Sequence, residues 1–475
     1  MLWKRCVSIS WAGSKYARWL VLAGMLGIAA PACGPSGASS GPAARTAASP
    51  RSVSSGARGA RDDGVQLVDP TSVESVDLAE LLAYADEHAP ALAVARSRAA
   101  LGDAALAEAS PLLPENPQLQ VQAGPHVDVS GATDVDVSVT LTQRVPVSGA
   151  RGASVAAADR FRELTEAEIE EVRWNVHCNV HAGYHAALVA RERATLAALA
   201  RGFQEGVLEI VKRQIAAGQS SPMNERLAEA EVAQARQQAL AAEQAYLAAR
   251  LDLAELSGWP AARPPVPEGA LDAPHEVPPL ETLIARAREH LPAFRTYDAA
   301  VREAEARTDA EERRAWPEPT IGVQVFHEGG VAAPPPAFGV QGIVSVPLPL
   351  WQRNQGGVAR ARADATIAQA QKASGESVLA AQIARNRSAV VSAAARVKSY
   401  GSDVLPRFDE NLKLVRRAFD LGEVDLLEVS VARDRFFRIQ LDALGAHADY
   451  FAALAALEKS VGVDLWNDTH ASEDR

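Results

Sequence analysis

The chain has 475 residues, of which 48% are hydrophobic and 23% are charged, and its formal net charge is −11 at pH 7. This acidic balance excludes nucleic acid as an expected partner, because phosphate binding requires a basic surface. The length allows more than one structural unit, so the elements are taken in chain order.

The first 32 residues are typical of a secretory signal peptide. Basic residues precede an apolar run at 19–30, which ends in small residues before Cys33. The segment 30–34 resembles a bacterial lipobox, in which the cysteine becomes the lipidated first residue. The alternative is an ordinary cleavage site with an incidental cysteine. We expect export, lipidation at Cys33, and a lipidated N-terminus and flexible tether over 33–70, which is rich in Gly, Ser and Ala.

Cysteine content agrees with this reading. Cys6 would leave with the signal peptide and Cys33 would carry lipid, so only Cys178 remains. No internal disulfide is then expected, and stability must come from packing and assembly.

The rest of the chain is predicted to contain a twofold internal repeat. Segments 78–92 and 280–294 are identical at 8 of 15 positions, and the match continues at a nearly constant offset through both halves. A register held over this length indicates a duplicated unit. The predicted boundaries are a first repeat at 71–258, a proline-rich linker at 259–279, a second repeat at 280–463 and a C-terminal tail at 464–475.

Each repeat opens with a helical pattern, at about 76–109 and 280–314, and continues into a predicted β-hairpin. The hairpins are expected at 117–146 and 319–347, between prolines. Over 134–142, apolar and polar residues alternate strictly, which is typical of a strand with one apolar face and one polar face.

A long helix is predicted after each hairpin. Residues 154–217 contain no proline and would span about 95 Å as one helix. The counterpart, 357–421, is expected to be interrupted near Pro406. Tight turns, called tips below, are predicted at 217–225 and 419–428, and each is followed by a shorter returning helix.

Four strands with one apolar face are too few to close a barrel, and a closed barrel is the only β structure that spans lipid. In an exported chain such strands need partners. Copies of the same chain would close the barrel and remove its edges. The sequence therefore predicts oligomerisation without fixing the number of copies.

The order of these elements resembles the TolC-like outer membrane factor (outer membrane efflux protein) family over about 70–463. The most diagnostic segment is 417–428, with a weaker counterpart at 213–218. Segment 344–350, ahead of Gly356, also fits the family's step from strand to helix. Two histidines, His88 and His290, stand where the family usually has asparagine.

The resemblance implies an α+β membrane protein that assembles as a homotrimer. Four strands from each chain would complete a twelve-stranded transmembrane β-barrel, and the helices would form a coiled-coil barrel reaching into the periplasm. It also implies a lipid-anchored outer membrane location and docking to an inner-membrane resistance–nodulation–division pump through a periplasmic adaptor (membrane fusion) protein. The match is nearest to the branch that exports metal cations or drugs, and no cofactor is implied.

The family's functional positions are the tips, which meet the adaptor and close the tunnel. Carried over by motif, the adaptor contacts are Gly218, Gln219, Ser221, Asn224, Phe419, Gly422 and Glu423. Asp425 and Glu428, repeated around a threefold axis, would form an acidic gate ring that attracts cations. The alternative is that these two acids only favour the dipole at the start of a helix.

His177, His181 and His185 are spaced four residues apart, so they form a row on one helix face. Histidines at this spacing can share a metal ion, which makes the row a weak metal candidate. With no carboxylate apparent to orient them, the simpler interpretation is a polar face that is solvated or lies between helices.

Three interpretations follow. The first is a passive exit duct driven by a partner pump, with type I protein secretion as a variant. The second is a structural periplasmic coiled-coil lipoprotein, and the third is an enzyme or metal-sequestering protein using the histidine row. The sequence shows no nucleophile elbow, phosphate loop or paired-cysteine site, so no enzyme is expected.

Overall fold

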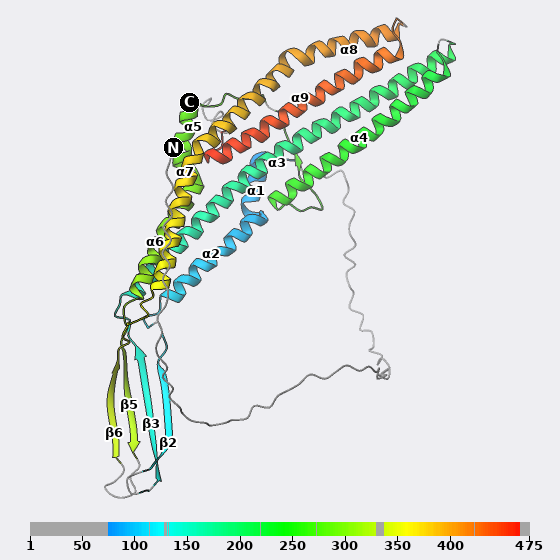
Figure 1. The fold of residues 1–475 in the computed structure, drawn as a ribbon. Helices are drawn as coiled ribbons and strands as arrows, with labels where there is room; N and C mark the ends of the chain where they lie inside the picture. Colours follow the sequence, from blue (N-terminus) through cyan, green and yellow to red (C-terminus); the bar gives the residue numbers. More distant parts are fainter. Residues whose placement is uncertain are drawn as a thin grey trace, which may run out of the picture. The chain divides into compact units, whose positions relative to one another are not determined.

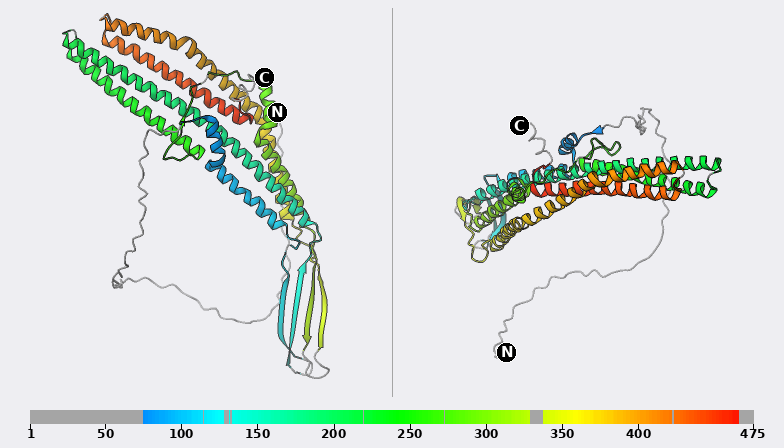
Figure 2. Two further views of the ribbon diagram at one scale, coloured as in Figure 1. Left: turned by 180° about the vertical axis from the view of Figure 1, so that it is seen from behind. Right: turned by 90° about the horizontal axis from the view of Figure 1, so that it is seen from above.

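The structure, a computed structural model, describes residues 75–465 except 114, 128–130, 132, 219, 272, 329–336 and 422 (Figure 1). The predicted signal peptide, Cys33 and the tether lie outside the described residues. Helices make up most of the described part, and a four-stranded sheet extends from one end of them (Figure 1, and Figure 2, left).

The opening helix predicted for each repeat is two helices. These are α1 (Leu78–His88), α2 (Pro90–Ala109), α5 (Leu280–His290) and α6 (Pro292–Arg313). The breaks fall at Ala89, with ψ 126°, and Leu291, with ψ 116°. Each of these residues precedes a proline, whose ring disfavours helical ψ at the preceding position. The first helix also begins later than predicted, because Val76 belongs to a short strand.

The two predicted hairpins form a single antiparallel sheet in the order β2-β3-β5-β6. The strands are β2 (Gln118–Val127), β3 (Thr133–Arg144), β5 (Thr320–Glu328) and β6 (Ala337–Ser345). The hairpins join through β3 and β5, where Val139 is opposite Val325 and Leu141 is opposite Val323. In this sheet β2 and β6 are therefore the edge strands.

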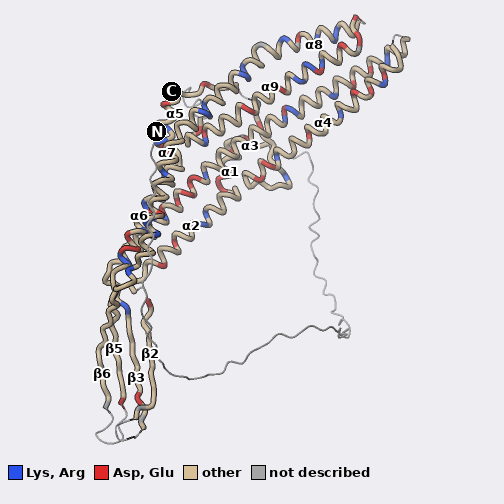
Figure 3. The backbone as a smooth tube through the Cα atoms, in the orientation of Figure 1, with Lys and Arg blue, Asp and Glu red and all other residues tan. Residues whose placement is uncertain are grey.

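The register gives the sheet one apolar and one polar face. Leu119 pairs with Leu141, which pairs with Val323, so apolar side chains align across three strands. On the opposite face Gln120, Thr140 and Gln324 align in the same way. Lys, Arg, Asp and Glu occur only towards the ends of the strands (Figure 3).

A helical hairpin follows each β-hairpin in the chain. The first consists of α3 (Ala150–Ala216) and α4 (Pro222–Ser257). The second consists of α7 (Gln355–Ser399), a π-helical turn η1 (Tyr400–Val404), α8 (Leu405–Asp420) and α9 (Leu426–Val461). The π turn lies just before Pro406, so the predicted interruption is confirmed. Proline lacks the N–H group that would continue the helical ladder.

A short parallel pair was not predicted. Strand β1 (Ser75–Val76) pairs with β4 (Val266–Pro267), and β4 lies inside the segment 259–279 that was expected to be a linker. The Tyr184 hydroxyl donates to the carbonyl oxygens of Val76 and Glu268, at 3.1 and 2.7 Å. Arg191 donates to the carbonyl oxygen of Pro267 at 2.9 Å. These contacts hold both strands on the middle of α3.

In the described part of the chain, buried apolar residues form three clusters along the helices. One surrounds Tyr184 and includes Leu81 and Leu253; a second surrounds Tyr450 and includes Leu283 and Ile383. The third lies nearer the tips. Among the described residues, no helix is both long enough and apolar enough to cross a membrane.

Candidate functional site

The first tip connects α3 to α4. Gly218 has a φ of 73°, a left-handed value that suits glycine, and its N–H donates to the Ile215 carbonyl oxygen at 2.9 Å. Ser221 precedes α4 in an extended conformation, and the Asn224 amide donates to Ser220 Oγ at 3.1 Å. Gln219 lies outside the described residues. The tip is therefore a compact turn with Gly218 and Ser221 exposed.

The second tip connects α8 to α9. The Glu423 N–H donates to the Ala418 carbonyl oxygen at 2.9 Å, a bond that closes the end of α8. Asp425 is the N-cap of α9, and its Oδ1 accepts a hydrogen bond from the Glu428 N–H at 2.8 Å. Gly422 lies outside the described residues. Glu423, Asp425 and Glu428 are exposed, and Asp425 has a capping role besides its charge.

Phe419 requires a correction. Its side chain is only 4% exposed and belongs to a cluster with Val207, Val211, Ala228 and Val429. An adaptor contact would need a side chain on the surface. The structure instead uses Phe419 to pack the two helical hairpins together, since Val207 and Val211 lie on α3 and Val429 lies on α9.

A polar link joins the same hairpins. Arg433 of α9 is 7% exposed, and its Nη2 donates to Glu231 Oε2 of α4 at 3.0 Å. The same carboxylate oxygen accepts from Gln204 of α3 at 3.0 Å. Sequence reasoning missed this link, because Glu231 and Arg433 are 202 residues apart.

The histidine row lies between α3 and α9. His181 Nδ1 is 2.9 Å from Glu458 Oε2, and these side chains are 3% and 1% exposed. His185 stacks on Phe451 of α9, with ring centroids 4.0 Å apart. His177 stacks on Trp174 and lies 3.9 Å from Asp464. The expectation that no carboxylate orients the row was wrong, because Glu458 contacts His181. The sequence pattern did not reveal this carboxylate because the two residues are 277 positions apart.

Burial and charge move the pKa values of this row in opposite directions. Burial lowers the pKa of His185 to about 3, helped by the neighbouring charge of His181. Burial also opposes protonation of His181, but the hydrogen bond to Glu458 and the charges of Glu458 and Asp464 outweigh it and raise that pKa. Burial raises the pKa of Glu458 as well. The His181–Glu458 pair is thus a buried, proton-holding contact.

The row is a contact between helices in this chain. Across the described ranges, no group of three or more His, Cys, Asp and Glu side chains is arranged to hold a metal ion. Cys178 is buried beside the row, and burial raises the pKa of its thiol.

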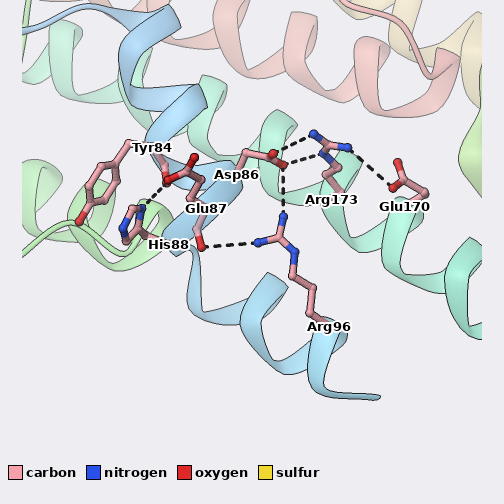
Figure 4. Close-up of polar contacts among 7 residues, drawn as sticks. All are labelled: Tyr84, Asp86, Glu87, His88, Arg96, Glu170 and Arg173. Atoms are coloured by element: carbon pink, nitrogen blue, oxygen red, sulfur yellow. Dashed lines mark hydrogen bonds and ion pairs between the residues drawn. The ribbon is translucent and has the colours of Figure 1, made fainter. Parts of the chain in front are cut away.

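The junction between α1 and α2 is fixed by charge and close packing (Figure 4). Arg173 of α3 binds Asp86 through two hydrogen bonds of 2.6 and 2.7 Å, and His88 Nδ1 lies 3.1 Å from the Tyr84 carbonyl oxygen. Gly258, which ends α4 with a φ of 77°, lies against this junction, so a Cβ there would overlap the His88 carbonyl oxygen. Gly462 ends α9 in the same way against Leu291.

The chain thus combines long helical hairpins, which have exposed acidic and polar tips, with a sheet that has one apolar face. The family model described as "Outer membrane efflux protein" matches residues 81–259 and again 283–463. The chain therefore belongs to the outer membrane efflux protein family. It is the outer membrane channel component of a tripartite efflux system and extends into the periplasm.

Known relatives agree with this assignment. The chain is 27% identical over 333 residues to the cobalt-zinc-cadmium resistance protein CzcC of Cupriavidus metallidurans, covering 68% of this chain and 77% of that protein. A membrane protein from Pseudomonas aeruginosa has the same fold, with a TM-score of 0.66 at 16% identity, covering 81% and 93% of the two chains. The Campylobacter jejuni CmeC outer membrane channel gives 0.65 at 13% identity, covering 84% and 89%.

Proposed function

We propose that three copies of this chain close their sheets into a twelve-stranded transmembrane barrel, and that the helical hairpins form a passive, non-catalytic duct below it. The one-sided sheet supports this proposal, because its apolar face needs lipid and its edge strands β2 and β6 need partners. The two family matches, one in each half, support an origin by internal duplication.

The proposed cargo is divalent metal cations, with drugs as the second candidate. The relative CzcC, named for cobalt, zinc and cadmium resistance, supports metal cations. The proposed partners are a periplasmic adaptor, which would bind the tips, and an inner-membrane resistance–nodulation–division pump. Because the pump would select the cargo, the duct would need only a negative electrostatic potential along its path that attracts cations.

The exposed tip acids would supply that field. Asp425 caps α9 and Glu428 lies in its first turn, so threefold symmetry would set six carboxylates around the tunnel end. A ring of like charge at a constriction favours counter-ions. The Gly218 and Ser221 surface of the neighbouring tip would remain available to the adaptor.

The experiment for this function is planar-bilayer recording with purified full-length protein. We expect cross-linked trimers and discrete conductance steps that favour cations over anions. A protein that remains a monomer and leaves bilayers impermeable would overturn the trimeric duct.

In the same recordings, the double variant Asp425→Asn and Glu428→Gln should lower the cation-to-anion permeability ratio several-fold. Asparagine also caps helices well, so the variant removes charge while keeping the start of α9. The matched control is Glu229→Gln, which removes an exposed acid from the side of α4. Equal cation-to-anion permeability ratios in the wild type and the double variant would contradict the acidic ring and would leave the proposed channel function unaffected.

A further inference from the structure

Histidine side chains gather where α3 meets α9. The histidine row lies on α3, and His447 lies on α9, with its ring centroid 6.3 Å from that of Phe451. His185 stacks on the same phenylalanine from the other helix, with ring centroids 4.0 Å apart and an interplanar angle of 2°. His185 is 5% exposed and Phe451 is 3% exposed. Imidazole and phenyl rings therefore form a buried contact between the two helical hairpins at this level.

Glu458 is the buried carboxylate of this contact. It lies against His181, and the ring centroids of His181 and His185 are 4.9 Å apart. The charges of Glu458 and Asp464 act on His181, whereas the charge that acts on His185 is that of His181. A proton on His185 would therefore place a second positive charge beside the His181–Glu458 pair. Like charges in a buried site disfavour each other. The geometry thus favours one proton, not two, on these neighbouring imidazoles.

Other titratable and charged side chains face the row from α3, from α9 and from the segment after α9. They are Cys178, Tyr184, His447, Lys459 and Asp464. Burial raises the pKa of the Cys178 thiol and raises the pKa of Tyr184 to about 12, so both groups are neutral near pH 7. The histidine and the lysine on α9 bring no negative charge, and Asp464 lies beside His177, about two helical turns from His185. A proton on His185 is therefore not offset by these neighbours.

We propose that the histidine row is an acid-sensitive joint: when the surroundings become acidic, protonation of His185 loosens the contact between α3 and α9. Since α3 leads to the first tip and α9 begins at the second, a looser joint frees one helical hairpin to move against the other. Every group named belongs to a single chain, so the inference goes beyond the proposed duct and does not depend on it.

The pKa values of the cluster give the direction of the effect. Burial lowers the pKa of His185 to about 3, and it also lowers the pKa values of His177 and His447. These imidazoles take up a proton at about pH 6.5 once water reaches them, so the packed state is favoured above that pH and is progressively lost as the pH falls below it. His181 and Glu458 act in the opposite sense, because both of their pKa values are raised in the packed state. The three lowered imidazoles outweigh that pair, so acid opens the joint.

Hydrogen exchange measured by mass spectrometry tests the joint in the full-length protein in detergent. The readout is the exchange rate of backbone amides in 181–189 and 447–455, divided by the rate of an unfolded chain at the same pH. Between pH 7.5 and pH 5.0 we expect the opening equilibrium to rise about 30-fold through His185, because each pH unit below about 6.5 contributes tenfold.

The variant His185→Phe keeps a ring that stacks on Phe451 but cannot take up a proton. It should therefore lose most of the pH dependence of the opening equilibrium. The matched control is His290→Phe on α5. Because His290 lies outside the row, with a side chain that is 45% exposed, this control should keep the pH dependence of the wild type.

The outcomes separate the joint from the duct. Wild-type exchange that stays constant between pH 7.5 and pH 5.0 would overturn the joint, and this reading needs no variant. A His185→Phe variant with the full pH dependence of the wild type would also overturn it. An acid-dependent opening that His185→Phe removes would support the joint even in protein that fails to form trimers, whereas that failure would overturn the duct.

Discussion

Replacing Glu458 with alanine is expected to lower the free energy of unfolding by about 3–5 kcal/mol, because breaking a buried charged pair leaves its partner without compensation. Glu458 is 1% exposed, and its Oε2 lies 2.9 Å from His181 Nδ1. Its Oε1 also accepts from the Leu465 N–H at 3.1 Å. The variant therefore removes the partner of a buried imidazole and releases the segment after α9.

The measurement is thermal and denaturant unfolding followed by circular dichroism in detergent. Asp449→Ala is the matched control on the same helix, because Asp449 pairs with Arg396 in solvent, with side chains 58% and 52% exposed. Such a pair contributes about 1 kcal/mol or less. Glu458→Gln, which keeps an acceptor for Leu465, should fall between them. A loss for Glu458→Ala no larger than that of the control would contradict the prediction.

Gly258→Ala is the second substitution expected to have a large effect. A left-handed conformation costs a residue with a Cβ about 1–2 kcal/mol. At Gly258 the Cβ would also overlap the His88 carbonyl oxygen, which cannot move without shifting the junction of α1 and α2. The variant should therefore lose more free energy of unfolding than the left-handed conformation alone would cost. Gly462→Ala should behave similarly, because a Cβ there overlaps the Leu291 backbone.

Two other glycines separate the causes in the same unfolding assay. Gly218 has a φ of 73° and open space around it, so Gly218→Ala should show the conformational cost alone. Gly206 lies inside α3 with open space, so Gly206→Ala should stabilise by about 0.5–1 kcal/mol. If Gly258→Ala lowered the free energy of unfolding no more than Gly218→Ala does, the predicted cost of the overlap with His88 would be contradicted.

Features governed by local patterns were predicted from the sequence. Strict alternation over 134–142 located β3, and the absence of proline over 154–217 located α3. Pro406 located the interruption of the last long helix. These signals work because a strand repeats every two residues and because proline removes a backbone donor.

Features that depend on distant residues were not predicted. Glu458 contacts His181 only once the two helical hairpins have packed together, and no sequence pattern near the histidine row indicates this contact. Phe419 resembles an exposed tip residue by motif, yet it is buried because α3 of the other hairpin covers it. The β1–β4 pair was missed because two-residue strands carry no periodicity.

That short pair also fixes the backbone just ahead of α1. Main-chain pairing joins β1 to β4, and the Tyr184 hydroxyl donates to Val76 of β1 and to Glu268, the residue after β4. The start of α1 is thereby tied to the middle of α3 through side chains that bind the backbone of β1 and β4.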